Sequence, residues 1–238
     1  MGFLTVFLII VSFLFFISIL FRGEINATRE RDPAAKNNIE VLLLYPGLHA
    51  IIGYRITNFL WRNKIPFIPR ALSQLFRFLT GVEIHPGATI GKGFFIDHGM
   101  GVVIGETTII GNNVTLFQGV TLGGTGKETG KRHPTLGDNI VVGTGAKVLG
   151  NIEIGSNSYI GANAVVIKSV PPNTTVVGVP GRVAKQDGQR IDSQMDHVHI
   201  SDPIMQHMKD LIRRIKTLED QVKPGGPTDQ PLSGEKFD

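Results

Sequence analysis

The sequence predicts a mainly β protein: a parallel β-helix of six-residue repeats, with a helical segment before it. Three observations support this prediction. Aliphatic residues recur six positions apart over most of residues 84–166, glycine follows many of them directly, and residues 29–80 show helical spacing instead. A fixed six-residue period is typical of a parallel β-helix. Each unit forms a short strand and a corner, three units close one coil, and the aliphatic side chain points inward.

The composition argues against two functional classes, thiol-dependent chemistry and nucleic-acid binding. The chain has 238 residues, no cysteine and a formal net charge of +4. A chain without cysteine has no disulfide and no thiolate for catalysis or metal binding. Its lysines and arginines form no dense run, so the charge pattern does not favour nucleic-acid binding.

Residues 1–24 form a hydrophobic N-terminal segment. The 19 residues from Phe3 to Phe21 carry no charge, and that is about the length a helix needs to cross a hydrocarbon layer of roughly 30 Å. Arg22, Arg29 and Arg31 follow and favour a cytoplasmic location for the rest of the chain. We expect an uncleaved anchor that tethers a cytoplasmic protein to the inner face of the membrane. The alternatives are a helix buried in an oligomer interface and a start codon placed too early.

Residues 25–82 form the predicted helical segment. Asp32 is expected to cap a helix that has Pro33 at its first position. Further helices are expected over residues 51–61 and 70–79, with two proline breaks between them.

Residues 83–185 form the predicted β-helix. Its inward-pointing aliphatic residues are Ile84, Ile90, Ile96, Val102, Ile110, Leu116, Leu122, Leu136, Val142, Val148, Ile154, Ile160 and Val166. Two insertions interrupt the period: one extra pair of residues between Val102 and Ile110, and the polar, glycine-rich stretch 123–135. That stretch is too polar for the core, so we expect it to protrude. Loops on rigid scaffolds often carry function.

Residues 186–238 form a C-terminal tail with an amphipathic helix over residues 203–222. Its apolar positions are spaced by 4, 3, 4, 3 and 4 residues: Ile204, Met208, Leu211, Ile215, Leu218 and Val222. This heptad seam is short for a free coiled coil, so it either joins protomers or packs against the β-helix.

Seven motifs of the sequence resemble those of one enzyme family. They are RDPAA (31–35), YPGLHAIIGYRI (45–56), EIHPGATIG (83–91), DHGMGVVIGET (97–107), VTLGGTGK (120–127), KRHPTLGD (131–138) and GVPGRVA (178–184). The region that contains them covers about two-thirds of the chain and resembles serine O-acetyltransferases, members of the hexapeptide-repeat acyltransferase superfamily. The repeat alone marks only the superfamily, whereas the RDPAA, DHGMGVVIGET and GGTGK…RHP set is more specific.

The resemblance implies a left-handed β-helix and a defined reaction. Acetyl would pass from acetyl-CoA to the hydroxyl of L-serine, giving O-acetyl-L-serine and CoA in the first step of cysteine biosynthesis from serine. No tightly bound cofactor and no metal are expected.

Two residues are the candidate catalytic pair. His98 lies in the DH motif, and an imidazole can accept the serine hydroxyl proton at neutral pH. Glu83 stands where many relatives carry an aspartate that orients this histidine, so the resemblance assigns it that role. A carboxylate in this position fixes the tautomer and stabilises the imidazolium. Because glutamate is one methylene longer, the geometry should differ slightly.

Four residues are the candidates for binding serine, a zwitterion that needs partners of both charges. By resemblance, Asp32 and Asp97 hold the ammonium group, Arg132 holds the carboxylate and His133 contacts the substrate. A guanidinium group suits a carboxylate because it can donate two parallel hydrogen bonds.

Acetyl-CoA is the expected co-substrate. The backbone N–H groups at Gly123 and Gly124 can approach the thioester carbonyl and stabilise its oxyanion. By resemblance, the pantetheine arm passes Thr144 and Ala162, where small side chains leave room.

Three other functions compete with this one. Another hexapeptide acyltransferase, acting on a sugar or xenobiotic, should lack the RDPAA segment and the Arg132–His133 pair. A zinc enzyme like the β-helical carbonic anhydrases could use His85, His98 and His133, but Arg132 beside such a site would oppose a cation. The third alternative is a non-catalytic scaffold.

The resemblance also implies a homo-oligomer, with a trimer favoured over a hexamer. Arg132 and His133 of one protomer would then face His98 of the next. Relatives that bind O-acetylserine sulfhydrylase often end in isoleucine, whereas this chain ends in Phe237–Asp238, so that complex is not expected.

Overall fold

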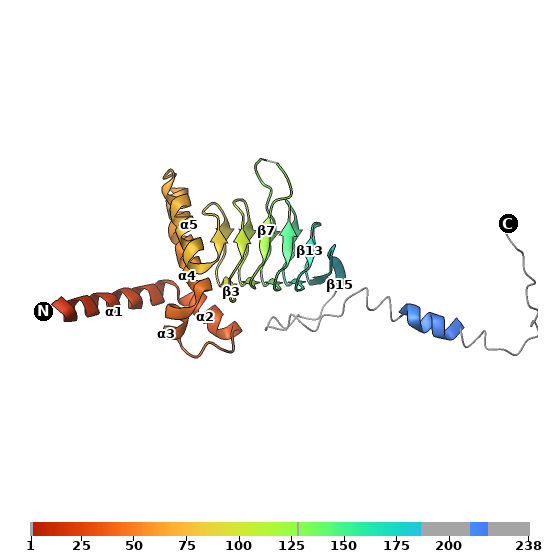
Figure 1. Cartoon of the computed structure of the whole chain (residues 1–238), viewed down its shortest axis with the longest axis horizontal. Coiled ribbons are helices and arrows are strands. Elements are labelled where there is room, and N and C mark those ends of the chain that lie inside the picture. Colours follow the sequence, from red (N-terminus) through yellow and green to blue (C-terminus); the bar gives the residue numbers. More distant parts are fainter. Residues whose placement is uncertain (1, 128, 187–209, 219–238) are drawn as a thin grey trace, which may run out of the picture. The chain divides into compact units, whose positions relative to one another are not determined.

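The computed structural model describes residues 2–127, 129–186 and 210–218. The chain divides into two compact units, Met1–Asp202 and Pro203–Asp238, which are described separately. In the first unit, short strands wind around a common axis and form the three sides of a column (Figure 1).

From residue 83 to residue 166, successive strands belong in turn to the three sheets. The strands are β1 (Glu83–Ile84), β2 (Thr89–Ile90), β3 (Phe95–Ile96), β4 (Val103–Ile104), β5 (Ile109–Ile110), β6 (Thr115–Leu116), β7 (Thr121–Gly123), β8 (Thr135–Leu136), β9 (Val141–Val142), β10 (Lys147–Leu149), β11 (Glu153–Ile154), β12 (Tyr159–Ile160), β13 (Val165–Val166), β14 (Thr174–Val177) and β15 (Arg182–Gln186). Sheet 1 has the order β1-β4-β7-β10-β13, sheet 2 has β11-β8-β5-β2, and sheet 3 has β15-β14-β12-β9-β6-β3. The strands pair in parallel, except that β14 and β15 are antiparallel.

The strand register confirms the six-residue period and the three-sided coil. Val103 pairs with Thr121, and Lys147 pairs with Val165, 18 residues apart in both cases. Eighteen residues are three units of six. The mainly β fold class is therefore correct.

The first insertion lies one corner earlier than the sequence predicts. Ile84 pairs with Ile104 and not with Val102, so the two extra residues fall between Ile96 and Ile104. Val102 is fully buried as well, which explains why the aliphatic pattern alone misplaced the insertion. The correction matters because the lengthened corner, residues 97–102, carries Asp97 and His98.

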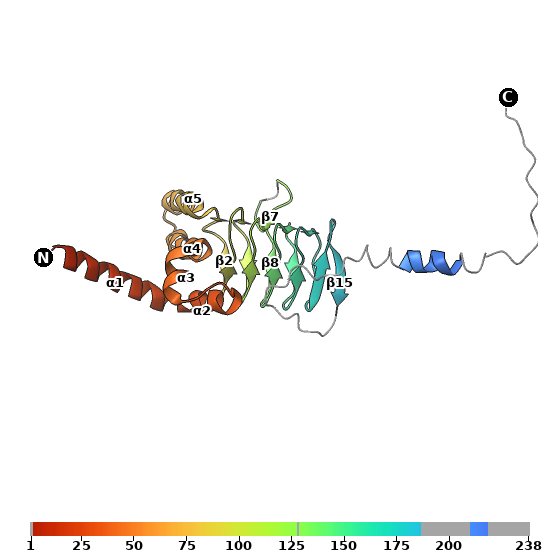
Figure 2. The ribbon, with the colours of Figure 1, turned by 60° about the horizontal axis from the view of Figure 1, so that its bottom comes forward.

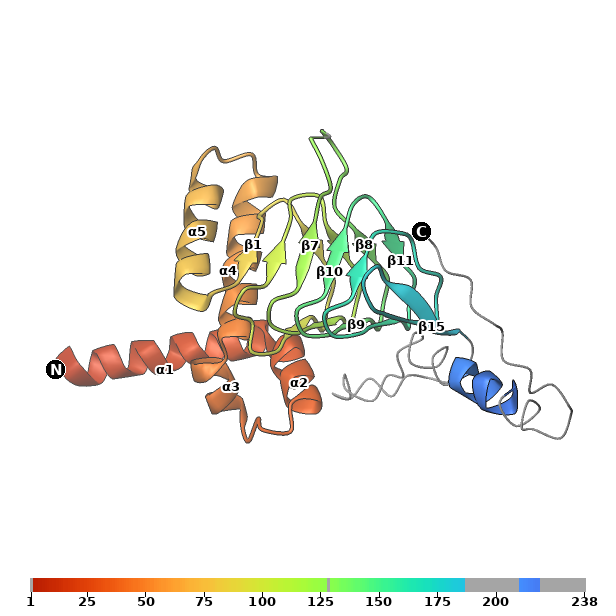
Figure 3. The ribbon, with the colours of Figure 1, turned by 45° about the vertical axis from the view of Figure 1, so that its right-hand side comes forward.

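The second insertion protrudes as the sequence predicts. Thr121 pairs with Lys147, 26 residues away, so this coil holds eight residues more than the regular 18. They form a loop between β7 and β8 that projects from the column (Figures 1 and 3).

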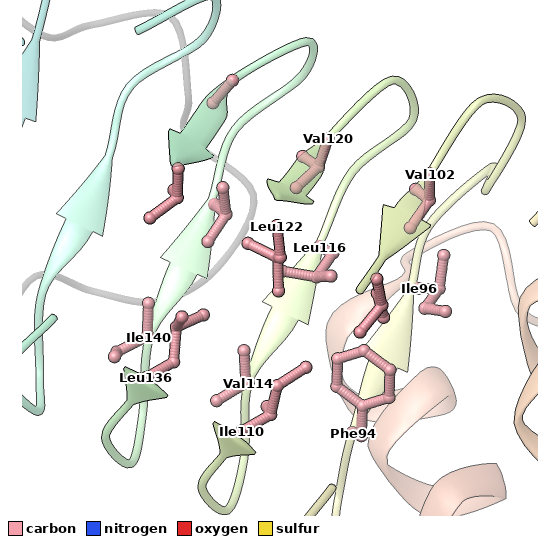
Figure 4. Close-up of a cluster of buried hydrophobic side chains, with 14 of the residues drawn as sticks. Phe94, Ile96, Val102, Ile110, Val114, Leu116, Val120, Leu122, Leu136 and Ile140 are labelled. Carbon is pink, nitrogen blue, oxygen red and sulfur yellow. The ribbon is translucent and has the colours of Figure 1, made fainter. Parts of the chain in front are cut away.

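Stacked aliphatic side chains fill the column. Ile104, Leu116, Leu122 and Ile160 have no exposed surface. Figure 4 shows how such side chains from successive coils point toward one another in the interior. Burying one of them completely contributes about 1.5–3 kcal/mol relative to exposure, so this repeated contact stabilises the fold.

Asparagines form a ladder along the corners between sheets 2 and 3. Asn113, Asn139, Asn157 and Asn173 all have φ between 56° and 59°. The side-chain amides of the first three each donate to the next asparagine along the column, over 3.1–3.3 Å. Asparagine suits these corners because it tolerates the left-handed conformation better than most residues.

Five helices precede the strands in the described part of the chain. They are α1 (Gly2–Leu20), α2 (Arg22–Arg31), α3 (Asn38–Leu44), α4 (Pro46–Arg62) and α5 (Ile68–Thr80). The prediction that Asp32 starts a helix is wrong: it follows the last residue of α2, and the next helix is capped by Asn37, whose side chain accepts from the Glu40 N–H. The Asp32 carboxylate instead closes a turn by accepting from the Ala34 N–H, 2.8 Å away.

Helix α4 packs against the first coil of the column. A Cβ on Gly47 would lie 2.1 Å from the Ile96 carbonyl oxygen, so only glycine permits this approach. The Tyr54 hydroxyl donates to the Ala88 carbonyl, and the Arg55 guanidinium donates to those of Ile90 and Gly91. These contacts fix the helices beside the corner that carries His98.

Helix α1 extends away from the column (Figure 2). Among the described residues, no single helix is both long and apolar enough to cross a membrane. Two bent pairs of helices satisfy length and composition only when taken together: Leu4–Leu20 with Arg22–Arg31, bent by 73°, and Asn38–Leu44 with Pro46–Arg62, bent by 69°.

In the second unit, residues 210–218 are helical. They include three positions of the predicted seam, Leu211, Ile215 and Leu218, which are all exposed within this unit. The rest of the predicted 203–222 helix lies outside the described residues, as do Phe237 and Asp238.

Candidate active site

Most of the candidate residues lie along two edges of the column, with sheet 1 between them. The His98 edge consists of the corners between sheets 3 and 1, residues 97–102, 117–120, 143–146 and 161–164. The loop edge consists of the corners between sheets 1 and 2, residues 85–88, 105–108, 124–134 and 150–152.

His98 is presented to solvent at the lengthened corner. Its backbone has φ of 56°, and its side chain is 73 % exposed. The ring Nε2 lies 4.0 Å from the carboxylate of Asp97, whose own side chain is only 7 % exposed. An accessible imidazole beside a buried acid is suited to accept and return a proton.

A second buried acid, Asp32, belongs to the same neighbourhood. The Tyr45 hydroxyl donates to its Oδ2 over 2.6 Å. Burial raises the pKa of Tyr45 above its usual range, and the hydrogen bond to Asp32 and the charges of Asp32 and Asp97 raise it further. Tyr45 is therefore neutral and remains a donor. Two buried carboxylates around one tyrosine form a site suited to a cation such as an ammonium group.

Glu83 has a different partner from the one the sequence suggests. In the described part of the chain its carboxylate pairs with Arg77 Nε at 3.3 Å, whereas the acid near His98 is Asp97. Glu83 begins β1, the strand next to the lengthened corner, so its orienting role stays a prediction.

The end of the protruding loop is fixed by one residue, Thr107. Its hydroxyl accepts from the backbone N–H of Arg132 at 3.1 Å and from that of His133 at 3.2 Å. The Lys131 ammonium donates to the Thr107 carbonyl at 2.7 Å. Three consecutive loop residues are thereby held against a single corner.

His133 is buried, and its tautomer follows from its contacts. The Thr107 backbone N–H donates to Nδ1 over 3.2 Å, so Nδ1 is an acceptor and the neutral ring carries its proton on Nε2. Burial lowers the pKa of His133, and the positive charges of Arg132 and Lys131 lower it further, although Glu106 opposes them. The ring is therefore a neutral donor at physiological pH.

Arg132 presents a cation at this edge. Among the described residues its guanidinium has no hydrogen bond or ion pair, and the residue is partly exposed. A guanidinium without such partners can bind the carboxylate of a ligand through two parallel hydrogen bonds.

The four residues expected to contact acetyl-CoA divide between the two edges. Thr144 and Ala162 lie on the His98 edge, where the Gly119 N–H donates to the Met100 carbonyl and the Asn163 N–H donates to that of Thr144. Gly123 ends β7, and Gly124 follows it as the first residue of the protruding loop on the loop edge. The two halves of the expected acetyl-CoA site are therefore on different edges of one chain.

The histidines of the zinc alternative are also separated. His98 is on one edge, and His85 and His133 are on the other. In the part of the chain that the structure describes, no three His, Cys, Asp or Glu side chains are grouped to hold a metal ion.

Comparison with known proteins gives the family. Residues 133–168 match the family model "Bacterial transferase hexapeptide (six repeats)". Serine acetyltransferase of Synechococcus elongatus is 58 % identical over 194 residues, covering 82 % of this chain and 79 % of that protein. The chain is a member of the serine acetyltransferase family.

Solved structures of serine acetyltransferases have the same fold. The crystal structure from Vibrio cholerae matches with a TM-score of 0.72 and 42 % identity, over 75 % of this chain and 70 % of that one. Soybean serine acetyltransferase complexed with serine matches with a TM-score of 0.66 and 47 % identity, over 68 % and 66 %. The left hand of the β-helix, which the resemblance implied, is thereby confirmed.

Sequence reasoning missed three residues of this site: Tyr45, Thr107 and Lys131. Tyr45 begins one quoted motif, Thr107 ends another and Lys131 begins a third, so their positions were visible. Their hydrogen bonds join residues 13 to 26 positions apart, and no local pattern signals such contacts.

Proposed function

We propose that this chain is a serine O-acetyltransferase, which transfers acetyl from acetyl-CoA to the hydroxyl of L-serine. One observation of the structure carries the proposal: an accessible imidazole, His98, lies beside the buried carboxylate of Asp97, in the neighbourhood of Asp32. The carboxylates would hold the serine ammonium and bring its hydroxyl to the imidazole. Family membership supports the same reaction.

The reaction uses the two substrates together with side-chain and backbone groups of the chain. His98 takes the hydroxyl proton as the serine oxygen attacks the thioester carbonyl carbon, and a tetrahedral oxyanion forms. Backbone N–H groups near Gly123 and Gly124 would stabilise that charge. The C–S bond then breaks, and the protonated His98 returns its proton to the sulfur. The products are O-acetyl-L-serine and CoA.

The complete site requires more than one copy of the chain. His98 and Arg132 lie on different edges, so a single column does not combine the general base with the group that would bind the carboxylate. In a homotrimer, the loop edge of one protomer would face the His98 edge of the next. Exposed Met100 on one edge and exposed Ile109 beside the other are suited to such a contact.

A coupled assay tests the function. Release of CoA thiol from acetyl-CoA is measured with L-serine, L-homoserine or simple sugars as acceptor, and the product is identified by mass spectrometry. We expect release with L-serine and a product heavier than serine by one acetyl group. Release that depends on a sugar and not on L-serine would overturn the proposal.

A further inference from the structure

Helix α1 exposes apolar side chains on all sides. Val6, Phe7, Leu8 and Ile9 are consecutive, and they expose 56, 54, 53 and 62 % of their surfaces. Successive helical residues point about 100° apart, so these four cover most of the circumference. Phe13, Phe16 and Leu20 continue the pattern toward the end of the helix. A helix that is apolar all round is normally buried in a protein interior or in lipid.

The base of α1 is held by the body of the protein. Phe21, the residue after α1, is buried in a cluster with Ile25, Val41 and Leu48, and Ile17 packs against it. The C-terminal end of α1 is therefore packed against the protein, whereas the rest of the helix exposes its apolar side chains.

Two exposed cationic side chains, Arg22 and Lys92, lie close to that base. A cavity of about 450 Å³ is lined by Leu20, Phe21, Gly23, Glu24, Arg55, Gly91, Lys92 and Gly93. Arg55 already pairs with Glu24 and donates to two carbonyls, whereas Lys92 and the neighbouring Arg22 are exposed. Apolar surface followed at once by exposed cations matches the change from hydrocarbon to anionic headgroups at a membrane surface.

We propose that α1 inserts into the hydrocarbon of an anionic phospholipid bilayer, with Arg22 and Lys92 at the headgroups and the acetyltransferase on the cytoplasmic side. The helix has 19 residues and no charged side chain, which suits immersion in hydrocarbon. It enters from one face of the bilayer and does not cross it, since no single described helix is long and apolar enough to do so. Basic residues after the helix favour the cytoplasmic side for the body.

Lipid covers α1 better than a second copy of the chain would. Two helices that pair in water each bury one apolar stripe and leave the opposite face in solvent. On α1 the opposite face is apolar as well. A fluid hydrocarbon surrounds the helix completely, so it is the occupant that leaves no apolar face in water.

Flotation with vesicles tests the proposal. The full chain is mixed with vesicles of phosphatidylcholine and phosphatidylglycerol in a 3:1 ratio, or of phosphatidylcholine alone, and floated on a density gradient. We expect the protein to float with both and to stay bound in 1 M salt. Lys92→Gln should weaken only the binding to the anionic vesicles at low salt, severalfold.

Variants of α1 provide the decisive comparison. Leu8→Glu combined with Phe13→Glu places two carboxylates in the hydrocarbon and should reduce the floated fraction at least tenfold, with unchanged acetyl transfer in solution. Leu8→Met combined with Phe13→Leu conserves apolarity and should float like the parent. The proposal is overturned if the parent stays at the bottom of the gradient. It is also overturned if the glutamate variant floats equally, or if sedimentation without vesicles shows an assembly that only the glutamate variant loses, because α1 then binds a second copy.

Discussion

The hydroxyl oxygen of Thr107 lies 2.9 Å from Nδ1 of His133, 26 positions away in the sequence. The same oxygen accepts the backbone N–H groups of Arg132 and His133. With two N–H groups donating to it, the hydroxyl has its own proton available for Nδ1. Thr107 therefore fixes both the loop and the proton position on His133, although it belongs to a different corner.

Thr107→Val should impair L-serine binding more than turnover. The variant keeps the side-chain shape and loses three hydrogen bonds, so Arg132 and His133 lose their fixed positions. We expect KM for serine to rise at least about tenfold, corresponding to about 1.4 kcal/mol, with a smaller change in kcat. Thr107→Ser should restore the parent values because it keeps the hydroxyl.

The adjacent threonine offers a matched control. Thr108 is buried, and its hydroxyl has no hydrogen-bond partner among the residues that the structure describes. Thr108→Val should leave KM unchanged and should not lower stability. If Thr107→Val and Thr108→Val have the same KM, Thr107 does not position the loop.

His98→Asn should abolish most turnover. Asparagine tolerates the positive φ at this corner, so the variant removes the base with less strain than His98→Ala would introduce. We expect kcat to fall at least a hundredfold, as is typical for the loss of a general base. Circular dichroism checks the fold, and near-normal turnover in a folded variant would refute the role of His98.

Tyr45→Phe should weaken serine binding through Asp32. The phenol donates one hydrogen bond to the Asp32 carboxylate, and the Ala34 N–H donates another. A hydrogen bond to a charged group contributes about 1.5–3 kcal/mol, so KM for serine should rise about tenfold or more. Tyr54→Phe also removes a buried hydroxyl that donates to a carbonyl, but away from the site. It should lower stability and leave KM unchanged, and an equal rise in KM for both variants would contradict this role of Tyr45.

Asn139→Ala should destabilise the column more than Asn139→Gly. Both variants break the asparagine ladder, but only alanine adds the cost of the left-handed conformation, about 1–2 kcal/mol. We expect a total loss of about 2–3 kcal/mol for alanine and about 1 kcal/mol for glycine. Urea denaturation measures the free energy of unfolding of both variants. Equal losses would show that the positive φ at this corner adds no cost for alanine.

Stability should depend on pH through His85. Burial lowers the pKa of His85 from its usual 6.5 to about 4, and the charge of Arg70 adds to this shift. Between about pH 4 and 6.5 the unfolded chain therefore binds more protons at this residue than the folded chain, so the contribution to stability falls as the pH falls. The slope from one proton is at most about 1.4 kcal/mol per pH unit.

His85→Asn isolates that contribution. Asparagine can still accept the hydrogen bond that the Gly87 N–H donates to His85 Nδ1, and it does not titrate. Urea denaturation at pH 7 and pH 5 should show a smaller loss for the variant than for the parent. Identical pH dependence in the two proteins would mean that His85 is not responsible.

Prediction from sequence succeeded wherever the information was periodic. Ile110, Leu116 and Leu122 are inward because a coil of 18 residues repeats the same inward position every six residues. Prediction failed where a residue fitted a sequence pattern but had a different role in the structure. Val102 is aliphatic and buried, yet it does not belong to the repeat, and only the pairing of Ile84 with Ile104 reveals that. Asp32 before proline resembles a helix start, but its carboxylate is committed to Ala34 and Tyr45.

The sequence by itself determined the period, the three-sided column, the protruding loop and the identity of the candidate residues, because each of these follows from residue types at short, regular spacing. The tertiary structure decided which residues meet. It placed His98 and Arg132 on different edges of the column. It also formed the hydrogen bonds between Thr107 and His133 and between Tyr45 and Asp32, and the ion pair between Glu83 and Arg77. Such contacts depend on how successive coils stack and how the helices pack on them, and hydrogen bonds between residues far apart in the chain leave no periodic trace in the sequence.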